Sequence, residues 1–468
     1  MERLRAPAGL EPDRHQVSRR GFAGGTMVLA AATALGACSA DRGPEPVAAR
    51  APGGDAPFAA LRDSGAQVVV AGEKLDTALL WRFYERHDFA RVWANRPAQA
   101  EALANAVLRA GDHGLDPELF HGSLLQRRDT FPPLRRELLV THAALTYAKA
   151  LAFGAVPPDR RKASEALTPD PLDVTEVLDA GIARRDPVAA IEALAPATPT
   201  YRSLREALRR NRPGVPAARL RQVEVNLERQ RWLPRALPPD RVWVDVTDQR
   251  LTLYRAQQPV FSTRVIVGEP VERKQSPELR ALIEASFFNP PWVIPRDIVE
   301  ADILPRIGRE PDYLERNNMV LRPNGEVEQR PGPDAGLGVV MFDMPNRFDV
   351  YLHDTPDKHL FSRDNRRISN GCIRVQNPLE FAALLMRQPV ESFEPVLATG
   401  RTTRRKLPAP MPVFLVYQTA AAGAGGAVEF RPDFYNRDAD LWQQLQKRPQ
   451  PRSVQARAER QGAARADG

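Results

Sequence analysis

The spacing of apolar residues changes once along this chain, near residue 240, and this change limits the choice of folds more than any other feature. Before it, apolar side chains recur every three or four residues, as in 79–84, which predicts helices. After it, apolar and polar side chains alternate, as in 242–246, which predicts strands. The sequence therefore predicts a multidomain α + β protein with an all-α N-terminal unit and a mainly-β C-terminal unit.

The helical pattern covers residues 58–236 and is punctuated by prolines, which end helices. Leu237-Pro-Pro-Asp240 closes it, and we expect a domain boundary there. The strongest helical stretches are 136–153, 186–194, 201–210 and 220–231.

The strand pattern predicts a β-rich domain over 241–446. Between 296 and 343 the alternation gives way to short amphipathic pieces with prolines and glycines. A plain loop of that length is unusual inside a compact domain, so we expect an inserted capping subdomain or lid there. The tail, 447–468, has no apolar face and is predicted to be disordered. Individual strands are expected at 261–267, 348–353, 413–417 and 428–430.

The N-terminus has the pattern of an export signal. Arg19 and Arg20 precede an apolar run, 23–37, that is too short to span a bilayer comfortably. The arginine pair resembles a twin-arginine signal, and the end of the run resembles the lipobox of bacterial lipoproteins, in which Cys38 would be lipidated. We therefore expect a signal peptide with lipobox over 1–38 and a flexible linker over 39–57.

The net charge of +8 suits an anionic partner: lipid headgroups, an acidic wall polymer or nucleic acid. No RNA-binding signature, zinc-finger spacing or phosphate-binding Gly-Lys loop occurs in the sequence, so we expect no nucleic-acid partner and no cofactor or metal. His113 and His121 lie in the helical part without further ligand spacing.

The chain has only two cysteines, far apart, which argues against a disulfide framework. Cys372 ends the stretch Ser369-Asn370-Gly371-Cys372. A free thiol has a pKa of roughly 8.5 and is only a few per cent ionised at neutral pH, so a nucleophilic role requires a base. His353, at the end of a predicted strand, can take the proton. We predict Cys372 as nucleophile and His353 as general base.

The residues around the thiol fit this chemistry. Arg374 and Arg367 are close enough in sequence to favour a thiolate. Gly371 permits a sharp turn, whose backbone N–H groups would form an oxyanion hole.

Each of these residues also has an alternative interpretation. An isolated cysteine can be an inert buried side chain. His353 and Asp354 can form a structural pair, although adjacent residues are poorly placed for Asp354 to orient the ring, so we expect a backbone carbonyl in that role. His359 is a rival base, and Trp292 can belong to the core as well as to a substrate-binding wall.

These residues closely resemble the catalytic motif of the L,D-transpeptidase family with a YkuD-type domain, in which histidine precedes a Ser-x-Gly-Cys-x-Arg box. The resemblance extends to its large, scaffold-bearing Gram-negative branch (YcbB type) and covers about residues 75–446. Further landmarks of that branch are similar to 226–234, 289–295, 342–346, 353–364 and 431–435.

The resemblance implies a fold and a reaction. The fold would be a helical scaffold domain followed by a mainly-β catalytic domain with an inserted capping subdomain. The cysteine would attack the L-centre carbonyl of diaminopimelate in a peptidoglycan tetrapeptide stem and release D-Ala. A neighbouring stem would then accept the acyl group from the thioester and give a diaminopimelate–diaminopimelate cross-link, and carbapenems would acylate the cysteine. Residues that would shape the site are Arg374, Ser369, Asn370, Gly371, Tyr351 and Trp292.

With an export signal, the resemblance implies a periplasmic enzyme, lipid-anchored to the outer membrane through Cys38. The sequence leaves the acyl acceptor open: water would make the protein a carboxypeptidase, and a lipoprotein would make it a wall–lipoprotein acyl transferase or hydrolase. A non-catalytic wall-binding lipoprotein and an unrelated thiol protease are the remaining alternatives.

The sequence departs from the family pattern at three places. Asn370 stands where smaller members carry histidine, and Lys274 to Glu278 replace the usual Thr-Pro. Only 211–223 lie between the predicted 201–210 helix and the landmark that begins at Asn226, where large members often carry a peptidoglycan-binding module. We predict no such module here.

Overall fold

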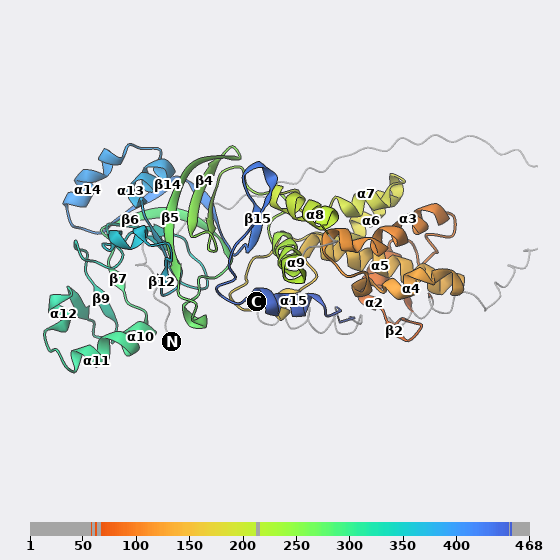
Figure 1. Cartoon of the computed structure of the whole chain (residues 1–468), viewed down its shortest axis with the longest axis horizontal. Coiled ribbons are helices and arrows are strands. Elements are labelled where there is room, and N and C mark those ends of the chain that lie inside the picture. The colour runs from red at the N-terminus through yellow and green to blue at the C-terminus, as the bar shows by residue number, and fades with distance from the viewer. Residues whose placement is uncertain (1–57, 59–60, 63–66, 212–215, 449, 452–468) are drawn as a thin grey trace, which may run out of the picture. The chain divides into compact units, whose positions relative to one another are not determined.

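The computed structural model describes residues 58, 61–62, 67–211, 216–448 and 450–451. The predicted signal peptide, Cys38 and the linker therefore lie outside the described residues, as does the tail from 452 on. Helices fill the first half of the described chain and a β-sheet most of the second (Figure 1), which confirms the predicted fold class. None of the described helices is both long and apolar enough to cross a membrane.

The helical unit is built around one long buried helix. This helix, α5 (Pro133–Phe153), begins with a proline in its first turn and ends at Gly154, two signals that favour those boundaries. All four helical stretches named from the sequence are helices in the structure. After a short hairpin of β1 (Val69–Val70) and β2 (Glu73–Lys74), the other helices are α2 (Thr77–Glu85), α3 (Pro97–Leu108), α4 (Gly122–Gln126), α6 (Val174–Ala183), α7 (Pro187–Glu192), α8 (Pro199–Asn211) and α9 (Ala217–Arg231).

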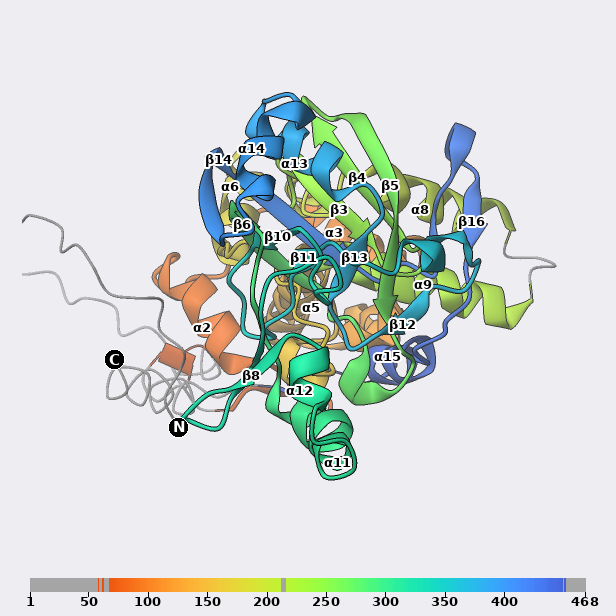
Figure 2. The ribbon, with the colours of Figure 1, turned by 90° about the vertical axis from the view of Figure 1, so that its left-hand side faces the viewer.

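The C-terminal half of the described chain contains a nine-stranded sheet in the order β12-β5-β13-β11-β10-β6-β14-β3-β4. β4 also pairs with β5, so the sheet closes on itself (Figure 2). The closed sheet encloses an apolar core. The strands are β3 (Arg241–Asp245), β4 (Arg250–Arg255), β5 (Gln258–Gly268), β6 (Leu279–Phe288), β10 (Val340–Asp343), β11 (Leu352–His353), β12 (Arg367–Ser369), β13 (Ile373–Val375) and β14 (Thr403–Val416). Two helices, α13 (Pro378–Met386) and α14 (Glu394–Ala398), add Phe381, Leu385 and Val396 to that core.

Two neighbouring strands, β3 and β14, join the sheet to the helices. Val413 and Leu415 of β14 face the core inside the sheet, whereas Phe414 and Val416 belong to the apolar core of the helical unit. Trp243 of β3 packs against the same helical core, with its ring 5.9 Å from that of Phe414. Because side chains alternate along a strand, these strands bury both faces.

The capping subdomain differs from the predicted range 296–343 at both ends. It begins with β7 (Trp292–Val293), which pairs with β9 (Val327–Gln329) and through it with β8 (Met319–Leu321). Val340–Asp343, at the other end, is β10 of the main sheet, because Val340 and Phe342 alternate into the large core. The subdomain also contains α10 (Arg296–Ile298), a π-helical turn (Val299–Ile303), α11 (Leu304–Ile307) and α12 (Tyr313–Arg316), and has its own small core of Ile294, Val299, Ile303 and Val327.

The chain returns to the helical unit after β14. A hairpin of β15 (Ala420–Ala422) and β16 (Val428–Phe430) contacts α8, and Leu441 and Leu445 of α15 (Asp438–Leu445) enter the helical core. Arg448 forms ion pairs with Glu73 and Glu118, so the described chain remains in contact beyond residue 447, where we predicted the disordered tail to begin. We predicted the β16 strand but not α15.

Candidate active site

The two predicted catalytic residues lie on neighbouring strands. β11 and β13 run parallel, with Leu352 opposite Ile373 and His353 opposite Arg374. Leu352 and Ile373 point into the sheet core and are fully buried. Because side chains alternate along a strand, His353 and Arg374 occupy the other face, and Cys372 directly precedes β13 on that side.

The ring of His353 is held in one orientation. His353 is buried, and its Nδ1 lies 2.5 Å from the backbone carbonyl oxygen of Asp354. A carbonyl can only accept a hydrogen bond, so Nδ1 carries the proton and Nε2 keeps its lone pair. Burial, together with the nearby charge of Arg374, lowers the pKa of His353 to about 3. The ring is therefore neutral, and a backbone carbonyl orients it as predicted.

The carboxylate of Asp354 has a separate structural task. It accepts a hydrogen bond from the backbone N–H of Val339 at 2.9 Å and forms an ion pair with Lys358. Gly338 packs so closely on Asp354 that any Cβ at this position would overlap the carboxylate. These contacts fix the backbone of Asp354, whose carbonyl in turn holds His353.

The thiol of Cys372 is less acidic than the sequence suggested. Desolvation raises the pKa of Cys372 to about 11, although the backbone N–H of Tyr351 and the charge of Arg374 both act in the opposite direction. Its Sγ lies 4.0 Å from the carbonyl oxygen of Asp349. Arg374 does favour the thiolate as predicted, but desolvation outweighs its attraction.

The two arginines expected to assist the thiol have other partners. Arg374 lies 3.2 Å from Asp357 and 3.4 Å from the hydroxyl of Thr355. Arg367 is stacked over the ring of Phe434 and does not contribute to the pKa of Cys372. Only Arg374 belongs to the site.

The turn before the cysteine is closed by a hydroxyl group. Ser369 Oγ accepts the Gly371 N–H at 3.1 Å and donates to the Cys372 carbonyl at 2.7 Å. Gly371 has a φ of +116°, which side-chain-bearing residues rarely adopt. The N–H of Gly371 is thus engaged within the turn, which leaves the N–H of Cys372 as the candidate oxyanion donor. Asn370 is exposed.

The capping subdomain reaches the site through Trp292. The side chain of Trp292 acts on the hydroxyl of Tyr351 and lowers its pKa, against the larger effect of burial, and the Tyr351 ring lies 5.9 Å from that of His353. Burial raises the pKa of Tyr351, so its hydroxyl stays protonated. Trp292 also packs on Gly336, where an added Cβ would lie 3.0 Å from the indole. Both predicted wall residues are therefore part of this site, whereas the rival base His359 is exposed on a 3-10 turn, Lys358–Ser362.

The histidines of the helical unit have roles in packing. His113 contacts Tyr201 and Glu192, each at 2.8 Å, and the His121 ring lies 5.2 Å from that of His142. Within the described residues, no group of three or more metal-ligating side chains comes together.

The sequence did not identify one contributor to the site. Ser276, in the stretch noted only as a departure from the family pattern, donates its hydroxyl to the Gly371 carbonyl at 2.8 Å and accepts the Gly268 N–H at 3.0 Å. Tyr435 donates to the Gly268 carbonyl at 2.7 Å. The contacts of Ser276 with Gly371 and of Tyr435 with Gly268 join residues more than 90 positions apart, and no local sequence pattern predicts them.

Comparison with protein families assigns both halves of the chain. Residues 239–402 match the sequence model of the L,D-transpeptidase catalytic domain. The chain carries an L,D-transpeptidase catalytic domain. Residues 78–208 match the scaffold domain, so the chain combines the two domain types that the family resemblance predicted.

The individual proteins to which the chain is similar match it over part of their length. A curated Haemophilus influenzae protein that bears the name of an L,D-transpeptidase is 31% identical over 222 residues, which make up 43% of this chain and 45% of the relative. The match thus spans less than half of that protein. Solved L,D-transpeptidases from Mycobacterium smegmatis and Enterococcus faecium each align with 38% of this chain at 11% identity, covering 58% and 50% of their own chains with TM-scores of 0.22 and 0.18.

Proposed function

We propose that this protein is a peptidoglycan L,D-transpeptidase that forms diaminopimelate–diaminopimelate cross-links through a thioester on Cys372. The observation that carries the proposal is the fixed tautomer of His353: Nδ1 donates to a carbonyl, which leaves the Nε2 lone pair for a thiol proton. The family assignment of the catalytic domain supports the same chemistry.

The raised pKa of Cys372 and the lowered pKa of His353 determine the order of proton transfer. At neutral pH the resting pair is a neutral thiol beside a neutral imidazole, not a thiolate–imidazolium pair. The proton therefore leaves Sγ for His353 Nε2 as the sulfur attacks the substrate carbonyl. This keeps the thiol unreactive until a stem peptide lies in the site.

In the first half-reaction, the acyl group of the donor stem is transferred to Cys372. The C–S bond forms at the L-centre carbonyl of diaminopimelate, and the N–H of Cys372 donates to the developing oxyanion. The bond to D-Ala breaks, and the imidazolium of His353 returns its proton to the leaving amine. In the second half-reaction, a side-chain amine of a second stem attacks the thioester and gives a proton to Nε2 of His353. The C–N bond forms, the C–S bond breaks, and the imidazolium returns the proton to the leaving sulfur, which regenerates the thiol.

We further propose that the enzyme works in the periplasm, attached to the outer membrane by a lipid on Cys38. The apolar run before Cys38 and the preceding arginine pair support this location. The partners of the enzyme would be donor and acceptor stem peptides of the wall.

The deciding experiment treats the purified protein with meropenem and measures intact mass. We expect one acyl adduct on the wild type and none on Cys372→Ala. Cys38→Ala is the matched control, because Cys38 is the only other cysteine, and it should keep the adduct. An adduct that persists in Cys372→Ala would show that Cys372 is not the nucleophile.

A second assay supplies tetrapeptide-stem muropeptides and separates the products by mass. The cross-linked diaminopimelate dimer is the expected product. Trimmed tripeptides without any dimer would instead establish water as the acceptor and a carboxypeptidase function.

A further inference from the structure

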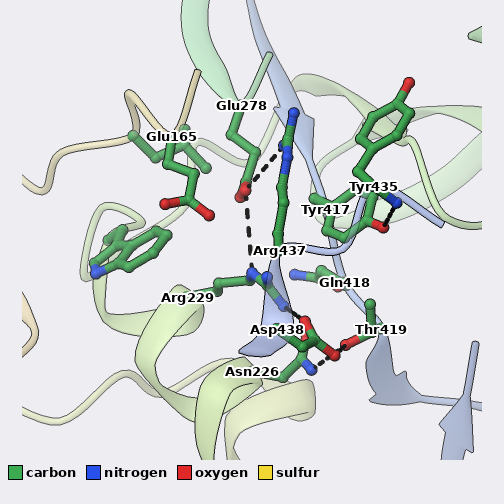
Figure 3. Close-up of polar contacts among 12 residues, drawn as sticks. Glu165, Asn226, Arg229, Glu278, Tyr417, Gln418, Thr419, Tyr435, Arg437 and Asp438 are labelled. Carbon is green, nitrogen blue, oxygen red and sulfur yellow. Dashed lines mark hydrogen bonds and ion pairs between the residues drawn. The ribbon is translucent and has the colours of Figure 1, made fainter. Parts of the chain in front are cut away.

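A cluster of buried charges lies where the helical unit meets the sheet. Glu278, immediately before β6, is held between two arginines whose side chains are at most 2% exposed (Figure 3). Its Oε1 lies 3.4 Å from a guanidinium nitrogen of Arg437 and 4.0 Å from Nε of Arg229. Arg229 also contacts Asp438 at 2.6 Å. The carboxylate therefore connects Arg229 of helix α9 with Arg437 of the C-terminal segment.

The backbone of Glu278 is fastened to the helical unit as well. Its N–H donates to the Ser164 carbonyl at 2.7 Å, and its own carbonyl accepts the Ala166 N–H at 3.0 Å. Glu165, between these two residues, directs a second carboxylate toward Glu278 (Figure 3). The helical unit thus holds this point of the chain by main chain and side chain together.

A continuous series of contacts leads from Glu278 to the nucleophile. Arg437 donates to the Ser276 carbonyl at 3.0 Å and to the side-chain oxygen of Gln275 at 3.1 Å. Ser276 Oγ in turn donates to the carbonyl of Gly371, the residue before Cys372. Loop 274–278 is therefore tied to the charge cluster at one end and to the catalytic turn at the other.

This arrangement is costly if it serves only to join two domains. Burying a charge costs several kcal/mol, and apolar side chains often stabilise such an interface equally well. Glu165 and Glu278 repel each other there, and burial raises the pKa of Glu278 to about 7 against the pull of Arg229 and Arg437. The cluster also fixes the orientation of the Arg437 side chain, because its guanidinium binds both Glu278 and loop 274–278.

We propose that Glu278 is a positioning residue for the transfer reaction: by orienting Arg437 and with it Ser276, it holds the Gly371–Cys372 turn in its reactive geometry. The inference rests on the proposed role of Cys372 as nucleophile. It assigns the helical unit a direct effect on the reaction, transmitted through Arg229 and Glu278.

The test compares Glu278→Gln, Ser276→Ala and the double variant in the full chain. The control is Asp170→Asn, which removes an exposed carboxylate that pairs with Arg280 across the same domain boundary at 2.9 Å. The first readout is meropenem acylation of Cys372, with the maximal rate separated from apparent affinity. The second readout is alkylation of Cys372 by iodoacetamide, followed by peptide mass mapping.

Each single variant should lower the maximal acylation rate about tenfold, because a small misplacement of a reacting atom is costly, while apparent affinity changes little. The double variant should lose no more than the worse single variant, since both substitutions interrupt one series of contacts. Asp170→Asn should react within about twofold of wild type. Full acylation by folded Glu278→Gln, or losses that multiply in the double variant, would overturn the inference.

Alkylation distinguishes this inference from the proposed function. If wild-type Cys372 is inert to meropenem, the proposed function fails, and the alkylation rates still report on the turn. A changed alkylation rate in Glu278→Gln and Ser276→Ala, but not in Asp170→Asn, supports positioning. Equal alkylation rates in the wild type, the two single variants and the Asp170→Asn control would refute the positioning role of Glu278.

Discussion

The strands that carry the reacting groups and the loop that supports them are held in place by different kinds of interaction. β11 and β13 are fixed by backbone pairing and by apolar side chains such as Leu352 and Ile373, which are fully buried. Loop 274–278 is fixed by buried charges, by a hydrogen bond from Arg437 to the Ser276 carbonyl, and by one from the Ser276 N–H to the Tyr435 hydroxyl. The apolar side chains of a strand recur every two residues along the sequence, whereas the contacts of the loop depend on partners far away in the sequence.

This contrast teaches where the site is robust. An apolar strand face tolerates changes of shape that preserve volume. A buried polar network loses more when one partner is removed, because the remaining groups are left unsatisfied. Substitutions on the strands should therefore change the chemistry, and substitutions in the loop should change both chemistry and stability.

The largest expected effect is at His353. Replacement by Gln keeps a polar side chain of similar size but removes the base, and we expect acylation of Cys372 to slow by about 10²–10⁴-fold. The acylation rate is measured by stopped-flow mixing with meropenem. His359→Gln is the matched control and should react like the wild type, because His359 is exposed on a separate turn. Loss of acylation in His359→Gln would reverse the assignment of the base.

The next effect is on stability and concerns the loop. At Gly268, an added Cβ would overlap the carbonyl oxygen of Lys274, so Gly268→Ala must displace the backbone of the loop. We expect a loss of about 1–3 kcal/mol in unfolding free energy, measured by urea denaturation. Gly308→Ala is the control, since its nearest neighbour lies 3.8 Å away. Equal stability of the two variants would mean that the loop is not tightly packed.

Much of the fold was predictable because it depends on local periodicity. The alternation from residue 242 predicted β3 and β4, and prolines together with helical spacing predicted α5 and α9. The strand β6 was not predicted, although its residues alternate as regularly as those of β3. The helix α15 was missed because its apolar residues face the helical unit, more than 200 positions away in sequence.

Part of the site was predictable from the sequence as well. Cys372 and His353 could be named because a thiol requires a base, and strand alternation puts both on one face. The pKa of Cys372 could not be predicted, because it depends on how deeply the folded chain buries the thiol. Ser276 and Glu278 were missed because their partners are brought together only by the tertiary structure.

The charge cluster should also make stability depend on pH. Glu278 faces Arg229, Arg437 and Arg161, which favour its charge, and Glu165, which opposes it. Its pKa in the folded protein is raised to about 7, above the value of an unfolded chain, so the folded state holds the proton more tightly. Stability from this group is therefore present below the unfolded value and is lost as pH rises toward 7.

Urea denaturation at a series of pH values tests this coupling. Between about pH 4.5 and 7, Glu278→Gln should lose less stability than the wild type, because the amide does not ionise. Parallel curves for the two proteins would show that Glu278 is ionised throughout that range, held so by its arginines.

The smallest expected effect is at the contact between the capping subdomain and the strands. Trp292→Phe keeps the aromatic packing on Gly336 but removes the indole nitrogen, the polar group through which Trp292 can act on the Tyr351 hydroxyl. A single polar contact contributes about 0.5–1.5 kcal/mol, so acylation should slow by roughly two- to tenfold. Tyr351→Phe removes the same contact from the other side, and the double variant should be no slower than either single one. Additive losses would mean that Trp292 and Tyr351 act on the substrate separately, and the capping subdomain would then contribute to binding without orienting the face that carries His353.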